Sequence, residues 1–128
     1  IMSRIQNLEQ FADKNNVKVV VNKNNDALYF SREMIPSPWQ GIEGIPMYMQ
    51  TGIIAFRRDT LINFNNMEET RLEQIESVDM NRVLETGGQV RMVPMDTIAI
   101  GVDTPDDLRE AEKIKGEIRK WEHDVWNY

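Results

Sequence analysis

Glu76 and Asp79 carry the carboxylates with the greatest chemical interest, because both are predicted to lie on the apolar side of a helix. At about 100° per residue, one arc of the helix predicted over residues 70–85 collects the apolar side chains. These are Leu72, Ile75, Val78, Met80, Val83 and Leu84. Carboxylates are rarely buried unless they are paired or bind something. Either the two acids are paired internally, with Arg32, Arg57, Arg58 or Arg82, or they border a polar ligand site.

The same stretch also predicts an exposed face and an end. Gln74, Ser77 and Asn81 lie opposite the apolar arc and are expected to face solvent. Gly87 and Gly88 follow, and glycine suits the left-handed residue that ends many helices. The pattern therefore predicts one long amphipathic helix.

A third carboxylate, Asp103, follows the apolar run 98–102 and stands just before a predicted helix. Thr104 is a suitable N-cap, Pro105 suits the first helical position, and acids follow at the positive end of the helix dipole. The new helix carries a stripe of Ala111, Ile114, Ile118, Trp121, Val125 and Tyr128. This stripe could pack into a core or form a dimer surface, where large aromatic residues are enriched.

These residues do not make a complete catalytic set. The sequence has no glycine-rich phosphate loop, no nucleophile beside a base and no carboxylate cluster with metal-binding spacing. It contains no cysteine, and its one histidine, His123, is too little for a histidine-rich metal site or a Ser-His-Asp triad. The reaction cannot be deduced from such patterns alone.

Composition narrows the class of protein. A chain of 128 residues is long enough for one domain with a real core, and we expect a single domain over residues 1–128. The net charge of −6, with no basic cluster, argues against nucleic-acid binding. No apolar run approaches the roughly 20 residues of a membrane span. The absence of cysteine and of a leader pattern fits a cytoplasmic protein.

The elements that would position these acids form an α/β or α+β pattern. Asn7 and Gln10 have the side chains of a capping box for a short helix. Residues 17–21 and 27–30 predict a β-hairpin. Further elements are an irregular loop over 31–46, a strand over 47–56, a short helix capped by Asp59 and ending at Asn65-Asn66, and a strand over 89–95. Trp39, inside the loop, could plug the core, contact a partner or offer a stacking surface.

Three blocks of residues resemble one family. They are Val17-Lys18-Val19-Val20 with Ala27-Leu28-Tyr29-Phe30-Ser31-Arg32 and Ile35-Pro36, then the string TRLEQIESVDMNR at 70–82, then GVDTPDDL at 101–108. Together, in this order and spacing, they resemble the CMP-KDO synthetases, the 3-deoxy-manno-octulosonate cytidylyltransferases. The resemblance covers roughly residues 5–115 and corresponds to the C-terminal half of the family.

The resemblance implies a partial Rossmann-like nucleotidyltransferase fold, with a mixed sheet and flanking helices. Such enzymes join CTP to an acidic sugar and release pyrophosphate, with Mg²⁺ present. By resemblance Asp103 takes the place of a metal-binding aspartate, and Arg32, Gln50 and Asp79 fall at sugar-binding positions. Glu76 would line the site beside them without an assigned role.

The sequence also departs from the family. Many members have histidine at Gln50, an aromatic residue at Ile54 and Glu-Gln at Asp79-Met80, so a different sugar preference is expected. The nucleotide-binding half would precede Ile1, and nothing in this chain replaces it. We therefore expect the chain to be inactive alone, to form a homodimer and to bind an acidic sugar. A further possibility is that it complements a separate nucleotide-binding subunit. The alternative is a free-standing dimeric binding module without catalysis. Residues 115–128 are expected to extend the last helix.

Overall fold

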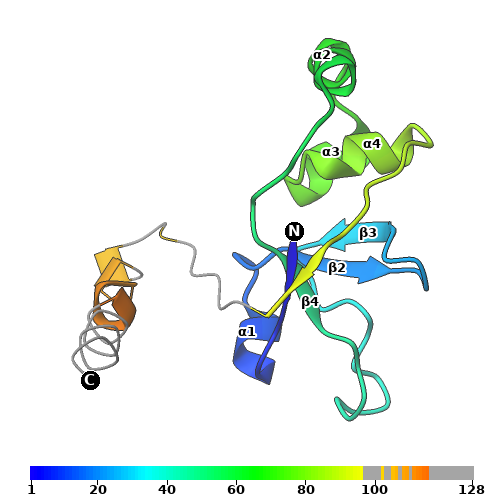
Figure 1. Ribbon diagram of the computed structural model, residues 1–128. Helices are drawn as coiled ribbons and strands as arrows, with labels where there is room; N and C mark the ends of the chain where they lie inside the picture. Colours follow the sequence, from blue (N-terminus) through cyan, green and yellow to red (C-terminus); the bar gives the residue numbers. More distant parts are fainter. Residues whose placement is uncertain (97–101, 103–104, 107, 110, 116–128) are drawn as a thin grey trace, which may run out of the picture. The chain divides into compact units, whose positions relative to one another are not determined.

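The computed structural model describes residues 1–96, 102, 105–106, 108–109 and 111–115. The chain divides into two compact units, Ile1–Thr97 and Ile98–Tyr128. The first unit contains all of the elements labelled here (Figure 1). Its strands are β1 (Met2–Arg4), β2 (Lys18–Val21), β3 (Ala27–Ser31), β4 (Tyr48–Gln50) and β5 (Pro94–Met95). Its helices are α1 (Leu8–Ala12), α2 (Arg58–Asn66), α3 (Arg71–Glu76) and α4 (Met80–Glu85).

The five strands form one mixed sheet in the order β3-β2-β4-β1-β5. Three neighbouring pairs are antiparallel, whereas β1 and β5 run parallel. The register places Met2 opposite Gln50 and Pro94, and Val19 opposite Phe30. The predicted mixed sheet with flanking helices is therefore confirmed.

The hydrophobic core lies between the sheet and the α3–α4 pair, which Figure 1 shows beside β2 and β3. Its central side chains come from β1, β2, β3 and α4 and from residues that flank β2, α4 and β5. They are Met2, Val17, Val19, Ala27, Phe30, Val78, Met80 and Met92. Burial of such apolar side chains is the main favourable term in folding. The α3–α4 segment is thereby fixed against the edge of the sheet formed by β3.

Two local predictions are confirmed. Asn7 caps α1, since its Oδ1 accepts from the backbone N–H of Gln10 at 2.8 Å, although the Gln10 side chain accepts from Gln6 N and not from Asn7 N. Strands β2 and β3 form the predicted hairpin. Its turn includes Asn25 at φ 62°, a conformation that asparagine tolerates better than most residues.

The single long helix predicted over residues 70–85 is wrong, because the chain breaks at Ser77. Ser77 is left-handed, at φ 53° and ψ 48°, and closes α3 with a hydrogen bond from its N–H to Glu73 O. The chain then restarts as α4. This break changes which residues face the core: Ile75 is 65% exposed, whereas Asn81 is 1% exposed instead of facing solvent.

Asn81 gives the physical reason for the break. Its Oδ1 accepts from Phe30 N at 3.2 Å, and its Nδ2 donates to Phe30 O at 3.0 Å. These two bonds satisfy backbone groups of β3 on the side away from β2. In an uninterrupted helix, Asn81 would lie about 100° from Met80 and on the side opposite Leu72 and Val83. The turn at Ser77 lets Asn81 and Met80 both reach the sheet.

We expect Asn81→Ala to destabilise the protein by about 2 kcal/mol or more, since both buried backbone groups of Phe30 would lose their partner. Urea unfolding followed by circular dichroism measures this change. Asn63→Ala is the matched control, because Asn63 lies exposed within α2. Equal stability of the two variants would contradict the role given to Asn81.

Other predicted boundaries also shift. Of the strand predicted over 47–56, only Tyr48–Gln50 forms a strand, β4. Beyond it, Thr51 N donates to Ile1 O, and Ile1 N donates to Ile53 O. The strand predicted over 89–95 is interrupted. Arg91 forms an isolated β-bridge with Asp26, and only Pro94–Met95 forms a strand, β5. Helix α2 ends at Asn66 as predicted but begins after Arg57, not Asp59. Trp39 is 88% exposed, so it does not plug the core.

In the second unit, the described residues 105–106, 108–109 and 111–115 have helical backbone. The described residues do not include Asp103, Thr104 or the stripe beyond Ile114. Residues 116–128 of the predicted C-terminal extension also lie outside them. Among the helices that the structure describes, none is long and apolar enough to cross a membrane.

Candidate functional site

A cavity of about 340 Å³ opens between the ends of β3 and β4 and the α3–α4 junction. Three residues from distant parts of the sequence meet there: Arg32, Gln50 and Asp79. They are the three residues that the family resemblance assigns to sugar binding. Ser77 and Glu69 also line this cavity.

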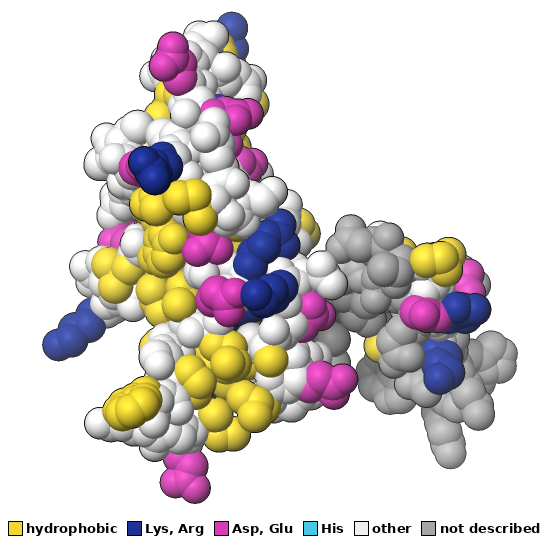
Figure 2. Space-filling view, turned by 180° about the vertical axis from the view of Figure 1, so that it is seen from behind, with side chains coloured by type: hydrophobic (Ala, Val, Ile, Leu, Met, Phe, Trp, Pro, Cys, Tyr) yellow, Lys and Arg dark blue, Asp and Glu magenta, His cyan; other side chains and the backbone are white. Residues whose placement is uncertain are grey.

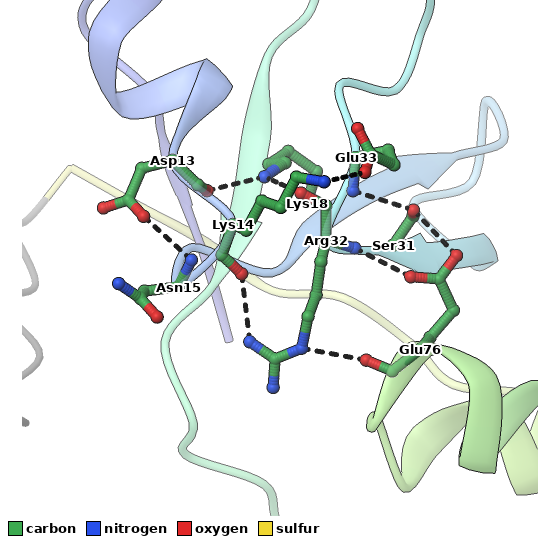
Figure 3. Close-up of polar contacts among 8 residues, drawn as sticks. All are labelled: Asp13, Lys14, Asn15, Lys18, Ser31, Arg32, Glu33 and Glu76. Carbon is green, nitrogen blue, oxygen red and sulfur yellow. Dashed lines mark hydrogen bonds and ion pairs between the residues drawn. The ribbon is translucent and has the colours of Figure 1, made fainter.

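Arg32 is held in place through its backbone and its guanidinium (Figure 3). Its Nε donates to Glu76 O at 2.9 Å, and its two terminal nitrogens donate to Lys14 O and Ser77 O at 3.0 and 3.2 Å. Each acceptor is a carbonyl, and no carboxylate forms an ion pair with Arg32 among the described residues. Since a guanidinium has five N–H donors, two remain for a ligand.

Lys18 holds the backbone of Arg32 in place. Its side chain is fully buried, and Nζ donates to Asp13 O at 2.8 Å and to Arg32 O. Burial lowers the pKa of the Lys18 ammonium, because a charge loses solvation inside the protein. Lys18 therefore anchors the backbone of Arg32 and the end of α1 together.

Glu76 lies behind the cavity and is occupied by internal bonds. Its carboxylate accepts from Tyr29 OH at 3.0 Å, Ser31 Oγ at 2.9 Å and Arg32 N at 3.0 Å. Burial acts to raise the pKa of Glu76, but these hydrogen bonds outweigh it and leave the pKa below its ordinary value. Glu76 is not among the residues lining the cavity. It fastens α3 to β3 through a tyrosine, a serine and a backbone N–H, and within the described residues it forms no ion pair with an arginine side chain.

Asp79 differs from Glu76 in its exposure and in its lack of internal bonds. It is exposed at the start of α4 and lines the cavity. Its carboxylate makes no hydrogen bond or ion pair with any other residue in the part of the chain that the structure describes. Gln50 is held by its backbone, since its N–H donates to Val17 O at 2.9 Å. Both side chains can therefore serve a ligand without breaking internal bonds.

An ion pair in the wall of the cavity, formed by the lining residue Glu73 with Arg82, was not anticipated from the sequence. Glu73 receives two hydrogen bonds from Arg82, at 2.7 Å from Nε and 2.5 Å from a terminal nitrogen. The exposed fractions of the two side chains are only 10% and 12%. Glu73 also accepts from Thr70 N at 3.2 Å. The spacing of Thr70 and Glu73 is that of a capping box and could have predicted this anchor.

The chemistry of the lining suits a polyhydroxylated anion. A carboxylate can pair with the two free donors of Arg32, and such charge-assisted bonds are the strong ones. Hydroxyl groups can donate to Asp79 and to Glu69, and Gln50 can both donate and accept. Among the described residues that line the cavity, Arg32 is the one cation, so it is the group to which an anion would bind.

Metal binding finds less support in the described residues. No group of three or more histidine, cysteine, aspartate or glutamate side chains among them could hold a metal ion. Asp103, the expected ligand, lies outside the described residues.

Comparison with known proteins gives a consistent result. The sequence model of a family described as "Cytidylyltransferase" matches residues 2–98. The 3-deoxy-manno-octulosonate cytidylyltransferase of Flavobacterium johnsoniae is 37% identical over 118 residues, covering 92% of this chain and 48% of that protein. The protein of the same name from Synechococcus elongatus is 44% identical over 99 residues, covering 77% and 41%.

A solved structure also matches. It is described as CMP:2-keto-3-deoxy-manno-octonic acid synthetase complexed with CTP, with a TM-score of 0.80 and 35% identity. The match covers 91% of this chain and 47% of that one. The chain thus spans about half the length of the curated relatives it matches.

Proposed function

The chain belongs to the cytidylyltransferase family, and on that premise we propose that it forms the sugar-binding part of an enzyme that activates an acidic, KDO-like sugar as its CMP derivative. Its relatives of known name are 3-deoxy-manno-octulosonate cytidylyltransferases. The observation that best supports this proposal is that Arg32, Gln50 and Asp79 line one cavity, although Asp79 follows Arg32 by 47 positions in the sequence.

In this proposal, each of the three side chains has a separate task. Arg32 pairs with the sugar carboxylate through its two free N–H groups, while its other donors keep it fixed against α3. Asp79 accepts hydrogen bonds from sugar hydroxyls. Gln50, which stands where many relatives have histidine, offers an amide in place of an imidazole and so shifts the preference among sugars.

The nucleotide and the metal require more than this chain offers. We propose that Asp103 gives one ligand to Mg²⁺, which supplies charge stabilisation to the CTP phosphates when bound. The remaining ligands and the nucleotide contacts would come from polypeptide equivalent to the other half of the relatives. Catalysis by the 128-residue chain alone is not expected. A cytoplasmic location and a homodimer are part of the same proposal.

Pyrophosphate release from CTP in the presence of KDO and Mg²⁺ tests this function. We expect no release from the chain alone, and release when the unmatched part of the Flavobacterium johnsoniae relative is supplied with it. In that combination, Asp103→Asn should lower the rate about 100-fold, as expected for a lost metal ligand. Asp106→Asn is the control, since Asp106 is a neighbouring exposed acid.

Three outcomes would oppose parts of this account. Release from the isolated chain would show that it needs no second half. An unchanged rate in Asp103→Asn would refute the metal assignment. KDO binding without release from any combination would favour the alternative of a dimeric binding module without catalysis.

A further inference from the structure

The Lys18 ammonium occupies an unusual position for a cation. On the face shown in Figure 2, Lys and Arg side chains lie at the surface, where lysines are usually found. Lys18 differs, because it is 0% exposed. Among the described residues, no carboxylate forms an ion pair with it. A buried charge is costly unless other groups compensate it, so the position of Lys18 requires an explanation.

The ammonium binds two backbone carbonyls near the candidate sugar site. Lys18 Nζ donates to Asp13 O at 2.8 Å and to Arg32 O. Asp13 is the C-cap of α1, and Arg32 directly follows β3. The carbonyl of the next residue, Lys14, accepts from the Arg32 guanidinium at 3.0 Å. Lys18 thus holds both the backbone of Arg32 and the segment that receives one of its guanidinium bonds (Figure 3).

We propose that Lys18 is a positioning residue for the acidic sugar: its ammonium sets the direction in which the Arg32 guanidinium meets the sugar carboxylate. The inference rests on the proposed function, because that function assigns the carboxylate to Arg32. Lys18 does not line the cavity, so it acts through Arg32 and not on the sugar. The pairing of a guanidinium with a carboxylate depends on the direction of the N–H groups, so a displaced Arg32 binds the carboxylate more weakly.

The surroundings of Lys18 determine when it loses its charge. Its charged neighbours are Asp13 and Lys14 at the end of α1, Arg32 and Glu33 after β3, and Glu76 in α3. Burial has the largest effect and lowers the pKa of Lys18 below its ordinary value of 10.5, although the three carboxylates act to raise it. As the pH rises through that lowered pKa, Lys18 becomes a neutral amine, whose hydrogen bonds to carbonyls are weaker. Sugar binding should therefore weaken in the alkaline range.

Isothermal titration calorimetry with KDO and with its methyl ester tests the proposal on the 128-residue chain. Lys18→Met removes the ammonium and leaves an unbranched side chain in its place. At pH 7 we expect this variant to bind KDO about tenfold more weakly, and the ester less than about threefold more weakly, because only KDO pairs with Arg32 through a carboxylate. A merely structural defect would weaken the binding of both ligands alike.

The pH profile gives a second measurement. Between about pH 8 and about pH 10, the KDO Kd of the wild type should rise about tenfold, whereas that of Lys18→Met should stay constant. Lys23→Met is the matched control, because Lys23 is exposed in the turn between β2 and β3, and it should keep the wild-type affinity and profile. Tyr29→Phe removes the phenol that donates to Glu76 and should also keep the profile. Circular dichroism checks that each protein remains folded at each pH.

Four results would overturn the proposal. They are unchanged KDO binding in Lys18→Met, equal weakening of KDO and its ester in that variant, a wild-type Kd that is constant in the alkaline range, or a profile that disappears in Tyr29→Phe. The wild type binds KDO in each of these cases, so the proposed function would stand. Absence of KDO binding by the wild type would instead overturn the proposed function and this inference with it.

Discussion

Glu73→Ala is expected to lower the free energy of unfolding by about 3 kcal/mol, because the largely buried guanidinium of Arg82 loses its carboxylate partner. Arg82 would keep only the carbonyl oxygens of Phe64 and Met67, at 3.2 and 3.3 Å, and the Phe64 ring. These contacts join α2 to α4 beneath the candidate sugar site. Urea unfolding at pH 7 measures the loss.

The same substitution should also change how stability depends on pH. The hydrogen bonds from Arg82 hold the pKa of Glu73 below its ordinary value of 4.5. The stability that Glu73 contributes is therefore fully present above pH 4.5 and is lost as the pH falls through the lower folded-state pKa. The difference between wild type and Glu73→Ala should shrink in that acidic range.

Glu33→Ala provides the control for this pair. Glu33 pairs with Lys14 at 2.6 Å, but both side chains are about two-thirds exposed, at 67% and 70%. Exposed pairs contribute little to stability. A Tm loss in Glu33→Ala as large as that in Glu73→Ala would contradict the importance given to burial.

Asp79→Asn is expected to weaken KDO binding about 10-fold or more, because hydrogen bonds to charged groups contribute roughly 1.5–3 kcal/mol. Stability should hardly change, since no described residue bonds to the Asp79 carboxylate. Isothermal titration calorimetry measures the Kd and thermal unfolding measures the Tm. The combination of weaker binding and unchanged Tm distinguishes a ligand-binding role from a structural one.

Asp59→Asn is the control for sugar binding. Asp59 is an exposed aspartate in the first turn of α2 and does not line the cavity. It should leave the Kd unchanged. An equal loss of binding in both variants would indicate a general charge effect, and no loss in either would remove Asp79 from the site.

Local sequence chemistry predicted part of this fold well. The cap at Asn7 and the hairpin of β2 and β3 depend on neighbouring residues, so their patterns could be interpreted directly. β1 was missed because a three-residue strand leaves almost no periodicity. The break at Ser77 was missed for another reason. Serine seldom takes the left-handed conformation, and the bonds that stabilise this arrangement join Asn81 to Phe30, 51 residues away.

The candidate site could be predicted only through the resemblance. Helix geometry alone treated Glu76 and Asp79 alike, whereas the structure separates them. Glu76 is bound by Tyr29, Ser31 and Arg32, and Asp79 is open to the cavity. The difference follows from the turn at Ser77, which a continuous helix does not contain. The contact of Arg32 with this turn likewise depends on tertiary structure.

The most direct test of the account is a titration of the ¹⁵N-labelled chain with KDO, followed by NMR and compared with the methyl ester of the same sugar. We predict that KDO shifts the resonances of Arg32, Gln50 and Asp79, with few changes elsewhere. The ester should bind at least 10-fold more weakly, since it cannot form the charged pair with Arg32. Shifts confined to another surface, or equal binding of KDO and its ester, would contradict the assignment of this cavity to an acidic sugar.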